Sequence, residues 1–415
     1  MSASYSELFR VFGRIGILSF GGPAAQISLM HKELVEERDW LTEDEFLQAL
    51  SFCMLLPGPE AMQLATYAGW QQRGILGGII SGLLFVLPGA CVIAVLAIAY
   101  GLYGNLDWVK ALFLGVQAAV IVIVLDALRK IATTTLTSRR SWGIAGTSFV
   151  ALYCFSTPFP LVIAAAGCFG WFAFNIDQVK EPKPTPPLVE ALPVLTIGVF
   201  LWLTPLFVSF VLGFQFLTEL ALFFSKMAVV SFGGAYAVLG YMSQVVVFDF
   251  QWLDTQEMLD ALGLAETTPG PLILVTQFVA MLAGLSQGSV GVAILAGILT
   301  LWVTFVPCFI WIFVGAPYLE WISTQAKLKA ALNGIMAAVV GVIANLSVWF
   351  AMHVIFNETF VGPFNVLYPN LDTINIAALF FAGLAMILLR YLKQSLLRVL
   401  LACAFAALGF SLFSS

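Results

Sequence analysis

Charged residues are scarce in this sequence, and no part of it has the composition of a soluble domain. Asp, Glu, Lys and Arg make up 10% of the 415 residues and 61% are hydrophobic, whereas a soluble domain carries about 25% charged residues. Apolar runs of about 18 residues or more recur along the chain, each long enough to cross a hydrocarbon core roughly 30 Å thick. The polar stretches between them are too short to bury a core. We therefore predict an all-α, multi-pass protein embedded in a lipid bilayer.

Residues suited to enzymatic chemistry are also lacking. The two histidines, His31 and His353, are far apart, and the six cysteines include no CxxC pair, so neither a metal centre nor a disulfide is expected. The phosphate-binding loop GxxxxGK followed by Ser or Thr is absent. No nucleophile–base pair and no redox-cofactor motif is found. The sequence indicates a protein that is not an enzyme, uses no cofactor and has no nucleic-acid partner.

The most informative feature that is present is an internal duplication. The motif SFGG occurs at 19–22 and again at 231–234, and the same offset of 212 residues places the PGP at 57–59 on the PGP at 269–271. Further along, an offset of 219 residues places Pro88 on Pro307. Matched spacing of such rare residue types predicts two homologous halves.

Each half contains six apolar elements, and one further apolar span joins the halves. We expect a first repeat over 1–178, a linker and connecting span over 179–214, and a second repeat over 215–415. An odd connecting span inverts the second half relative to the first, as in many secondary transporters. The predicted elements are 8–30, 46–70, 75–100, 109–128, 142–155 and 158–175, then 191–212, then 217–248, 258–283, 288–315, 330–352, 374–389 and 396–413.

The distribution of Lys and Arg agrees with this topology and predicts a cytoplasmic N-terminus. With that orientation most cations fall in cytoplasmic segments, as the positive-inside rule requires. Those cations are Arg10, Arg73, Arg129, Lys130, Arg139, Arg140, Lys180, Lys183, Lys327, Lys329, Arg390, Lys393 and Arg398. In an alternative topology the SFGG and PGP elements are re-entrant hairpins. The number of membrane crossings then stays odd or even as before, but Lys32 and Arg38 move to the cytoplasmic side. Both versions stay open.

Glycine and proline interrupt the apolar segments at matched places in the two halves. Breaks of this kind free backbone groups, and they persist in a membrane only where protein or a water-lined cavity covers them. A half-helix that starts near mid-membrane offers unpaired N–H groups and a positive dipole end to an anion. The alternative is that the glycines permit close helix packing and that the prolines only kink the membrane helices. The candidate substrate-binding residues at the breaks are Ser19, Gly21, Gly22, Gly58, Ser231, Gly233, Gly234 and Gly270.

Two cations occupy equivalent positions inside apolar segments. Arg14 and Lys226 each lie five residues before an SFGG motif. A cation at the centre of a membrane helix costs at least about 2.5–3.5 kcal/mol, so it usually has a partner or a function. Here the partner is predicted to be a transported dianion. The alternative is that each side chain extends to the membrane interface.

Acidic and amide side chains provide further candidates. Glu60, Glu266 and Asp126 are candidates for proton coupling, although each could equally be the charge partner of a cation, namely Arg14, Lys226 or Arg73. Gln63 and Gln277 follow the PGP motifs and could donate hydrogen bonds to an oxyanion, although packing is an equal alternative. Glu45 and Glu257 are expected to be structural, at the first turn of their helices.

The motifs together resemble the signature of the chromate ion transporter family. They read SFGGPAAQ at 19–26, RDWLTEDEF at 38–46, LLPGP at 55–59, FVLPG at 85–89, and AETTPGP at 265–271. The resemblance implies a bacterial inner-membrane protein associated with chromate resistance by efflux, with sulfate as a structural mimic of the substrate. The family often has histidine where this sequence has Gln26.

The expected function is export of chromate, driven by the membrane potential or the proton motive force. A transporter or channel for another anion, such as sulfate or an organic carboxylate, is the alternative. A homodimer stays open.

Overall fold

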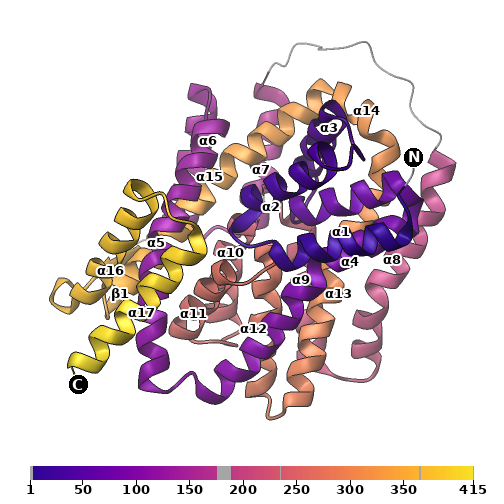
Figure 1. Ribbon diagram of the computed structural model, residues 1–415. Coiled ribbons are helices and arrows are strands. Elements are labelled where there is room, and N and C mark those ends of the chain that lie inside the picture. The colour runs from indigo at the N-terminus through magenta and orange to yellow at the C-terminus, as the bar shows by residue number, and fades with distance from the viewer. Residues whose placement is uncertain (1–2, 175–187, 234, 364–365, 415) are drawn as a thin grey trace. The chain divides into compact units, whose positions relative to one another are not determined.

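The computed structural model describes residues 3–174, 188–233, 235–363 and 366–414. The predicted Pro/Lys linker over 179–187 and Gly234 lie outside these residues. The described chain is almost entirely helical (Figure 1), which confirms the predicted fold class. One two-stranded antiparallel sheet, β1 (Thr359–Val361) with β2 (Leu367–Pro369), was not expected.

The chain forms two compact units, and each contains pieces of both sequence halves. Unit 1 comprises residues 1–98, 175–238 and 268–329, and unit 2 comprises 99–174, 239–267 and 330–415. The units therefore cut across the repeats of the sequence. All four SFGG and PGP breaks belong to unit 1.

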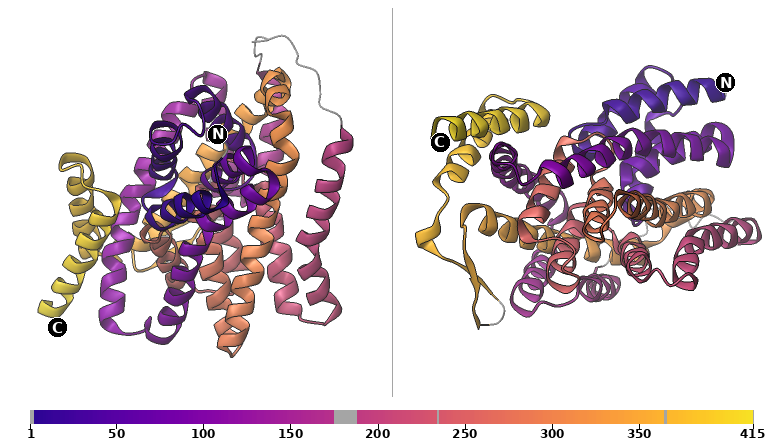
Figure 2. Two further views of the ribbon diagram at one scale, coloured as in Figure 1. Left: turned by 45° about the vertical axis from the view of Figure 1, so that its right-hand side comes forward. Right: turned by 90° about the horizontal axis from the view of Figure 1, so that it is seen from below.

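Unit 1 is built from the N-terminal helices of both halves. Three helices of this unit, α8, α9 and α13, contact one another and run side by side in Figure 2. Its helices are α1 (Tyr5–Leu18), α2 (Gly22–His31), α3 (Glu43–Leu55), most of α4 (Glu60–Tyr103), α8 (Leu188–Val211), α9 (Gln215–Val230), α12 (Val275–Ser286), α13 (Val290–Gly315) and α14 (Leu319–Thr324).

Unit 2 collects the helices that end both halves, together with the helix Thr255–Thr267 of the second half. In Figure 1, α16 and α17 pack beside α5. Its helices are α5 (Asp107–Thr135), α6 (Arg139–Phe155), α7 (Phe159–Ala173), α11 (Thr255–Thr267), α16 (Ile376–Met386) and α17 (Leu396–Ser414). Two more helices, α10 (Ala235–Gln244) and α15 (Ala326–Ile355), pass from unit 1 into unit 2.

The long element α4 is two helices, 60–72 and 75–103, which meet at a sharp reversal. Arg73 and Gly74 have non-helical backbone angles, with φ of −142° and +61°. The two helices then pack closely, because a Cβ on Gly69 would collide with Gly77 and Ser81. The equivalent hairpin in the second half is α12–α13, which turns at Gly288. This reversal confirms the boundary predicted between the elements 46–70 and 75–100.

Local sequence also explains where the helices before the PGP motifs begin. Thr42 and Glu45 form a reciprocal capping box at the start of α3. Asp254 and Glu257 make the same exchange at the start of α11. Such boxes satisfy the unpaired N–H groups of a first helical turn. The structural role expected of Glu45 and Glu257 is confirmed.

In the described chain, six helices are long and apolar enough to cross a membrane: 60–103, 107–135, 191–211, 290–318, 326–355 and 396–413. The helices on either side of the SFGG and PGP breaks have 10–16 residues each, except that the first PGP leads into α4, whose first segment ends before the reversal at Arg73. A membrane crossing needs about 20 residues, so none of these helices spans a bilayer by itself. Their length favours the re-entrant alternative. The inverted orientation of the halves stays a prediction.

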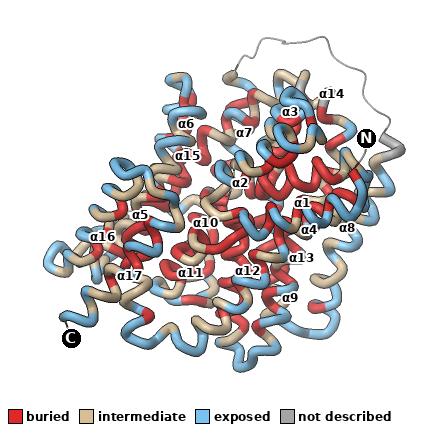
Figure 3. Tube along the Cα trace, viewed as in Figure 1, coloured by how far each residue is buried: buried red, intermediate tan, exposed pale blue. Residues whose placement is uncertain are grey.

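Burial separates the core of unit 1 from its lipid-exposed side. Figure 3 shows α12 buried along most of its length, whereas α8 is largely exposed. The exposed side chains of α8 include Phe200, Phe207 and Phe210. Exposed apolar side chains on a membrane helix are suited to contact lipid acyl chains.

Candidate functional site

The four breaks of unit 1 are joined to one another across the sequence halves. The N–H of Gly58, in the first PGP, donates to the carbonyl of Ser231, in the second SFGG, over 3.0 Å. The N–H of Gly270, in the second PGP, donates to the carbonyl of Ser19, in the first SFGG, over 2.9 Å. The two bonds are equivalent under the 212-residue offset. The PGP turn of each half is therefore hydrogen-bonded to the SFGG motif of the other half.

The prolyl segments that follow the breaks pack in the same reciprocal way. Gly89, in the LPG sequence at 87–89, lies so close to the second PGP that a Cβ would collide with the carbonyl of Pro269. Its equivalent under the 219-residue offset is Cys308, whose sulfur would lie 2.7 Å from a Cβ on Gly58. Both PGP glycines have positive φ, +121° at Gly58 and +89° at Gly270. Close approach and backbone angle both require glycine at these two positions.

Gln26 reinforces one of the two junctions. Its side chain is 1% exposed, and its Nε2 donates to the carbonyl of Gly270 over 2.7 Å and to that of Ser19 over 3.2 Å. The equivalent residue in the second half is Val238, which cannot make such bonds. The junction between the first SFGG and the second PGP is therefore the more strongly held of the two.

Replacement of Gln26 by leucine is expected to destabilise the protein by about 1–3 kcal/mol, because the carbonyl of Gly270 loses its side-chain donor in a buried place. The thermal unfolding midpoint in detergent should fall by a few degrees. Gln287→Leu, at an exposed glutamine, serves as the control. Equal unfolding midpoints for Gln26→Leu and the control would show that the Gln26 side chain does not stabilise the junction.

Several donors predicted to contact an anion are already engaged, which corrects the expected geometry. The N–H groups of Gly58 and Gly270 bind the serine carbonyls, and the hydroxyls of Ser19 and Ser231 donate to carbonyls of their own helices, at 2.6 and 2.9 Å. Buried polar groups pair with the nearest acceptor, since an unmade hydrogen bond is costly. In this conformation these groups are not directed at a ligand.

The same holds for the two glutamines. Nε2 of Gln63 donates to the carbonyl of Pro57 over 2.7 Å, and Nε2 of Gln277 donates to that of Ala90 over 3.1 Å. The amide oxygens of both residues are buried without a hydrogen-bond partner. These two oxygens are acceptors, so they suit water or another donor and do not suit an anion. The packing alternative fits Gln63 and Gln277 better than oxyanion binding.

Uncapped N–H groups remain at the start of α2. Gly21 precedes this helix with φ of +90°, Pro23 lies in its first turn, and no side chain caps it. Ala24 and Ala25, in the same turn, are exposed. The start of α2 therefore combines N–H groups that no side chain caps with the positive end of the helix dipole.

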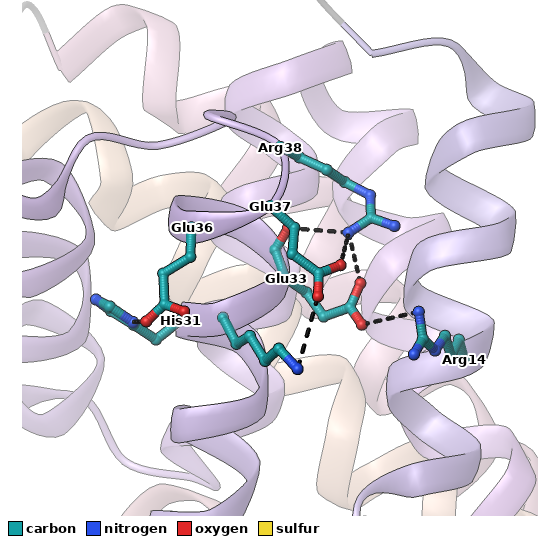
Figure 4. Close-up of polar contacts among 7 residues, drawn as sticks. Arg14, His31, Glu33, Glu36, Glu37 and Arg38 are labelled. Atoms are coloured by element: carbon teal, nitrogen blue, oxygen red, sulfur yellow. Dashed lines mark hydrogen bonds and ion pairs between the residues drawn. The ribbon is translucent and has the colours of Figure 1, made fainter.

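Arg14 has a carboxylate partner, as Figure 4 shows. Its Nη1 lies 3.2 Å from Oε1 of Glu33, whose side chain is 2% exposed, while that of Arg14 is 57% exposed. Nη1 of Arg38 lies 2.6 Å from the other oxygen of Glu33. Glu33 therefore holds two guanidinium groups at the π-helical turn Lys32–Glu36 that follows α2. Lys226, the equivalent of Arg14, is also exposed on its helix.

His31 links the end of α2 to α3 and gives this region a pH dependence. Its Nε2 lies 2.7 Å from Glu43 and its Nδ1 lies 3.1 Å from Glu36. The hydrogen bond to Glu43, with that to Glu36, raises the pKa of His31 above its ordinary value of 6.5.

A raised folded-state pKa stabilises the fold fully below the ordinary value and loses that stabilisation as the pH rises through the folded value. The unfolding midpoint of the wild type in detergent should therefore fall relative to that of His31→Gln as the pH rises above about 6.5. A wild-type midpoint that tracks the variant across this range would contradict the pairing.

The three acidic candidates occupy different environments. Asp126 pairs at 2.8 Å with Lys130 on its own helix, a cation that was not among the expected partners. Glu266 is buried on α11, and Glu60 begins α4 directly after the first PGP. No two of the three lie in the same helix.

Comparison with known proteins identifies the family. The family model described as chromate transporter matches residues 6–171 and 218–409. The chain belongs to the chromate transporter family. The two matched segments fall one in each half of the sequence, as an internal duplication requires.

Three curated relatives of the chromate transporter family align over most of their own length. The probable chromate transport protein of Synechococcus elongatus is 33% identical over 82% of this chain and 83% of its own. The chromate transport protein of Pseudomonas aeruginosa is 32% identical over 82% and 79%, and that of Cupriavidus metallidurans is 29% identical over 81% and 80%. No solved structure matches the chain significantly.

In this family member, sequence reasoning missed two polar residues. Gln26 was noted only as a departure from histidine, and its bond to Gly270 joins positions 244 residues apart. Asp260, buried on α11, has no acidic equivalent in the first half, where Gln48 stands. The repeat pattern, which carried the other predictions, gives no signal at either position.

Proposed function

We propose that this protein exports chromate from the cytoplasm across the bacterial inner membrane, with its N-terminus in the cytoplasm. One observation carries the proposal, namely the reciprocal bonding of the SFGG and PGP breaks of the two halves. Discontinuous helices that meet at matched positions of two repeats are the usual construction of a transporter's central site. Membership of the chromate transporter family, and the printed names of the relatives, support chromate as the cargo.

The direction follows from the charge of the cargo. Each elementary charge moved through a membrane potential is worth about 2.3 kcal/mol per 100 mV. A dianion that leaves an inside-negative cell therefore gains roughly 4.6 kcal/mol per 100 mV, equivalent to over a thousandfold in concentration ratio. Export needs no other energy source, whereas uptake would need several co-transported cations.

In the proposed cycle the two bonds Gly58–Ser231 and Gly270–Ser19 hold the breaks together in one state. Rocking of the halves about the PGP turns opens the site alternately to each side of the membrane. The oxyanion then occupies the region of the breaks, near the uncapped turn of α2 that includes Gly21 and Gly22. Arg14 and Lys226 supply positive charge, and Arg14 exchanges the carboxylate of Glu33 for the substrate.

The substrate is tested with purified protein in liposomes. Uptake of radiolabelled chromate should saturate with concentration and should be inhibited by excess sulfate, because the two dianions have the same tetrahedral shape. Empty liposomes, and liposomes with heat-inactivated protein, are the controls. Uptake that rises linearly without saturation would support an anion channel in place of a carrier.

A carrier for another anion is the second candidate, since the breaks would serve any oxyanion. It predicts that sulfate or an organic carboxylate is transported by protein that leaves chromate outside. Parallel flux assays with labelled sulfate and a labelled dicarboxylate decide between the candidates.

A further inference from the structure

A buried carboxylate in unit 2 forms short hydrogen bonds to two neutral side chains. Asp260, on α11, is 4% exposed. The hydroxyl of Tyr100 donates to its Oδ2 over 2.6 Å, and Nε2 of Gln117, on α5, donates to its Oδ1 over 2.6 Å. The amide of Gln256 lies one turn away at 3.5 Å. Three segments distant in sequence thus meet at one ionisable group.

Among the described residues, no Lys or Arg forms an ion pair with this carboxylate. The charge that acts on it is Asp254, before α11, and Glu257 acts in turn on Tyr100, so both nearby charges have the same sign as Asp260. The charged side chains of the helices packed against α11 are Asp107, Lys110, Asp126, Arg129 and Lys130 on α5 and Arg398 on α17.

The surroundings of Asp260 have opposing effects on the ionisation of its carboxyl group. Removal from water and the nearby carboxylates disfavour the charged form, whereas the two donated hydrogen bonds favour it. The Tyr100 hydroxyl can donate to a carboxylate or rotate and accept from a carboxylic acid. Both protonation states of Asp260 can therefore be hydrogen-bonded in place, which suits a group that repeatedly binds and releases a proton.

Asp260 and Tyr100 lie on segments that the chain connects directly to the PGP turns. Asp260 lies on the helix that runs directly into the second PGP at 269–271, and Tyr100 lies near the end of the helical hairpin that follows the first PGP. The chain passes between the two units at residues 98 and 99 and again at residues 267 and 268. The bond between Tyr100 and Asp260 thus joins, within unit 2, the two segments that lead to both PGP turns.

We propose that Asp260 is the proton-binding residue of this transporter and that its protonation is coupled to anion movement through α11 and the hairpin 60–103. The inference rests on the proposed anion transport and adds the coupling residue. It replaces the candidate Asp126, whose charge is balanced by Lys130, and it requires no acid at the breaks themselves.

The test uses the full-length protein in liposomes that contain a pH-sensitive dye, with chromate flux measured in parallel at a fixed membrane potential. In the wild type, proton movement should accompany chromate movement, and the flux should vary with pH. Asp260→Asn keeps the size of the side chain and an oxygen that accepts a hydrogen bond. It should abolish the chromate-dependent dye signal and the pH dependence while potential-driven chromate flux persists. Asp372→Asn, at an exposed aspartate of the same unit, should behave as the wild type.

Tyr100→Phe provides a second readout that does not require the loss of the carboxylate. It removes a donor to the charged form, so the pH midpoint of transport should move to higher pH. Dye signals that persist in Asp260→Asn, or a wild type that moves chromate without protons, would overturn the inference and leave chromate transport standing. An inactive Asp260→Asn combined with an unmoved midpoint in Tyr100→Phe would show a structural role only. A wild type without chromate flux would overturn the proposed function together with this coupling.

Discussion

Replacement of Gly58 or Gly270 by alanine is expected to reduce chromate transport about tenfold or more. Both residues have positive φ, where a side chain costs about 1–3 kcal/mol. At Gly58 a Cβ would also lie 2.7 Å from the sulfur of Cys308 and 2.8 Å from Nε2 of Gln63, and at Gly270 it would lie 2.9 Å from Leu274. The side chains of Cys308, Gln63 and Leu274 must shift to relieve these contacts, which disturbs the packing around the N–H groups that bind Ser231 and Ser19. A tenfold loss corresponds to about 1.4 kcal/mol.

The matched control for this prediction is Gly288→Ala. Gly288 also has positive φ, +105°, but a Cβ there meets nothing within 4 Å. The control carries the conformational strain without the close contacts, so its transport should stay much nearer to that of the wild type. Flux in liposomes, normalised to folded protein by size-exclusion chromatography, is the measurement. Equal losses in all three variants would remove the special role of the PGP turns.

The combined replacement of Arg14 and Lys226 by glutamine is expected to abolish transport. A dianion that enters an apolar region needs compensating positive charge, and these two cations recur at equivalent positions of the two halves. Each single variant should retain partial flux, because one cation remains. The measurement is chromate flux in liposomes at constant potential. Wild-type flux in the double variant would show that neither cation binds the substrate.

The ion pair between Arg14 and Glu33 requires a further control, because Arg14→Gln leaves a buried carboxylate with Arg38 alone. Removal of one partner of a buried pair is destabilising in its own right. Glu33→Gln combined with Arg14→Gln removes both partners. If Arg14 serves only to balance Glu33, this pair of changes should restore flux as well as thermal stability. If Arg14 binds the anion, stability should recover and flux should not.

The sequence predicts the fold class and the places where the helices break. Apolar run lengths indicate the membrane elements, and the offset of 212 residues identifies both SFGG and both PGP breaks. These are properties of short segments, set by backbone constraints of glycine and proline. For the same reason the structural role of Glu45 and Glu257 at the first turn of their helices could be predicted from a few neighbouring residues.

The pairing between breaks could not be predicted, because it joins residues more than 170 positions apart. The contacts of Gly58 with Ser231 and of Gly270 with Gln26 depend on how whole helices pack. The choice between oxyanion binding and packing for Gln277 stayed open for the same reason, since its side chain donates to the carbonyl of Ala90, 187 positions away. The duplication predicts two repeats and gives no signal for the compact units, each of which combines pieces of both repeats.

The most direct test of the central claim is the uptake of radiolabelled chromate into inverted membrane vesicles, with and without a membrane potential. The claim is that the paired breaks carry chromate out of the cell, and in inverted vesicles that movement is inward. Wild-type vesicles should accumulate chromate only when the interior is positive, and vesicles with the Gly58→Ala and Gly270→Ala changes together should not. A lack of accumulation above empty-vector vesicles, in membranes shown to contain folded protein, would contradict chromate export.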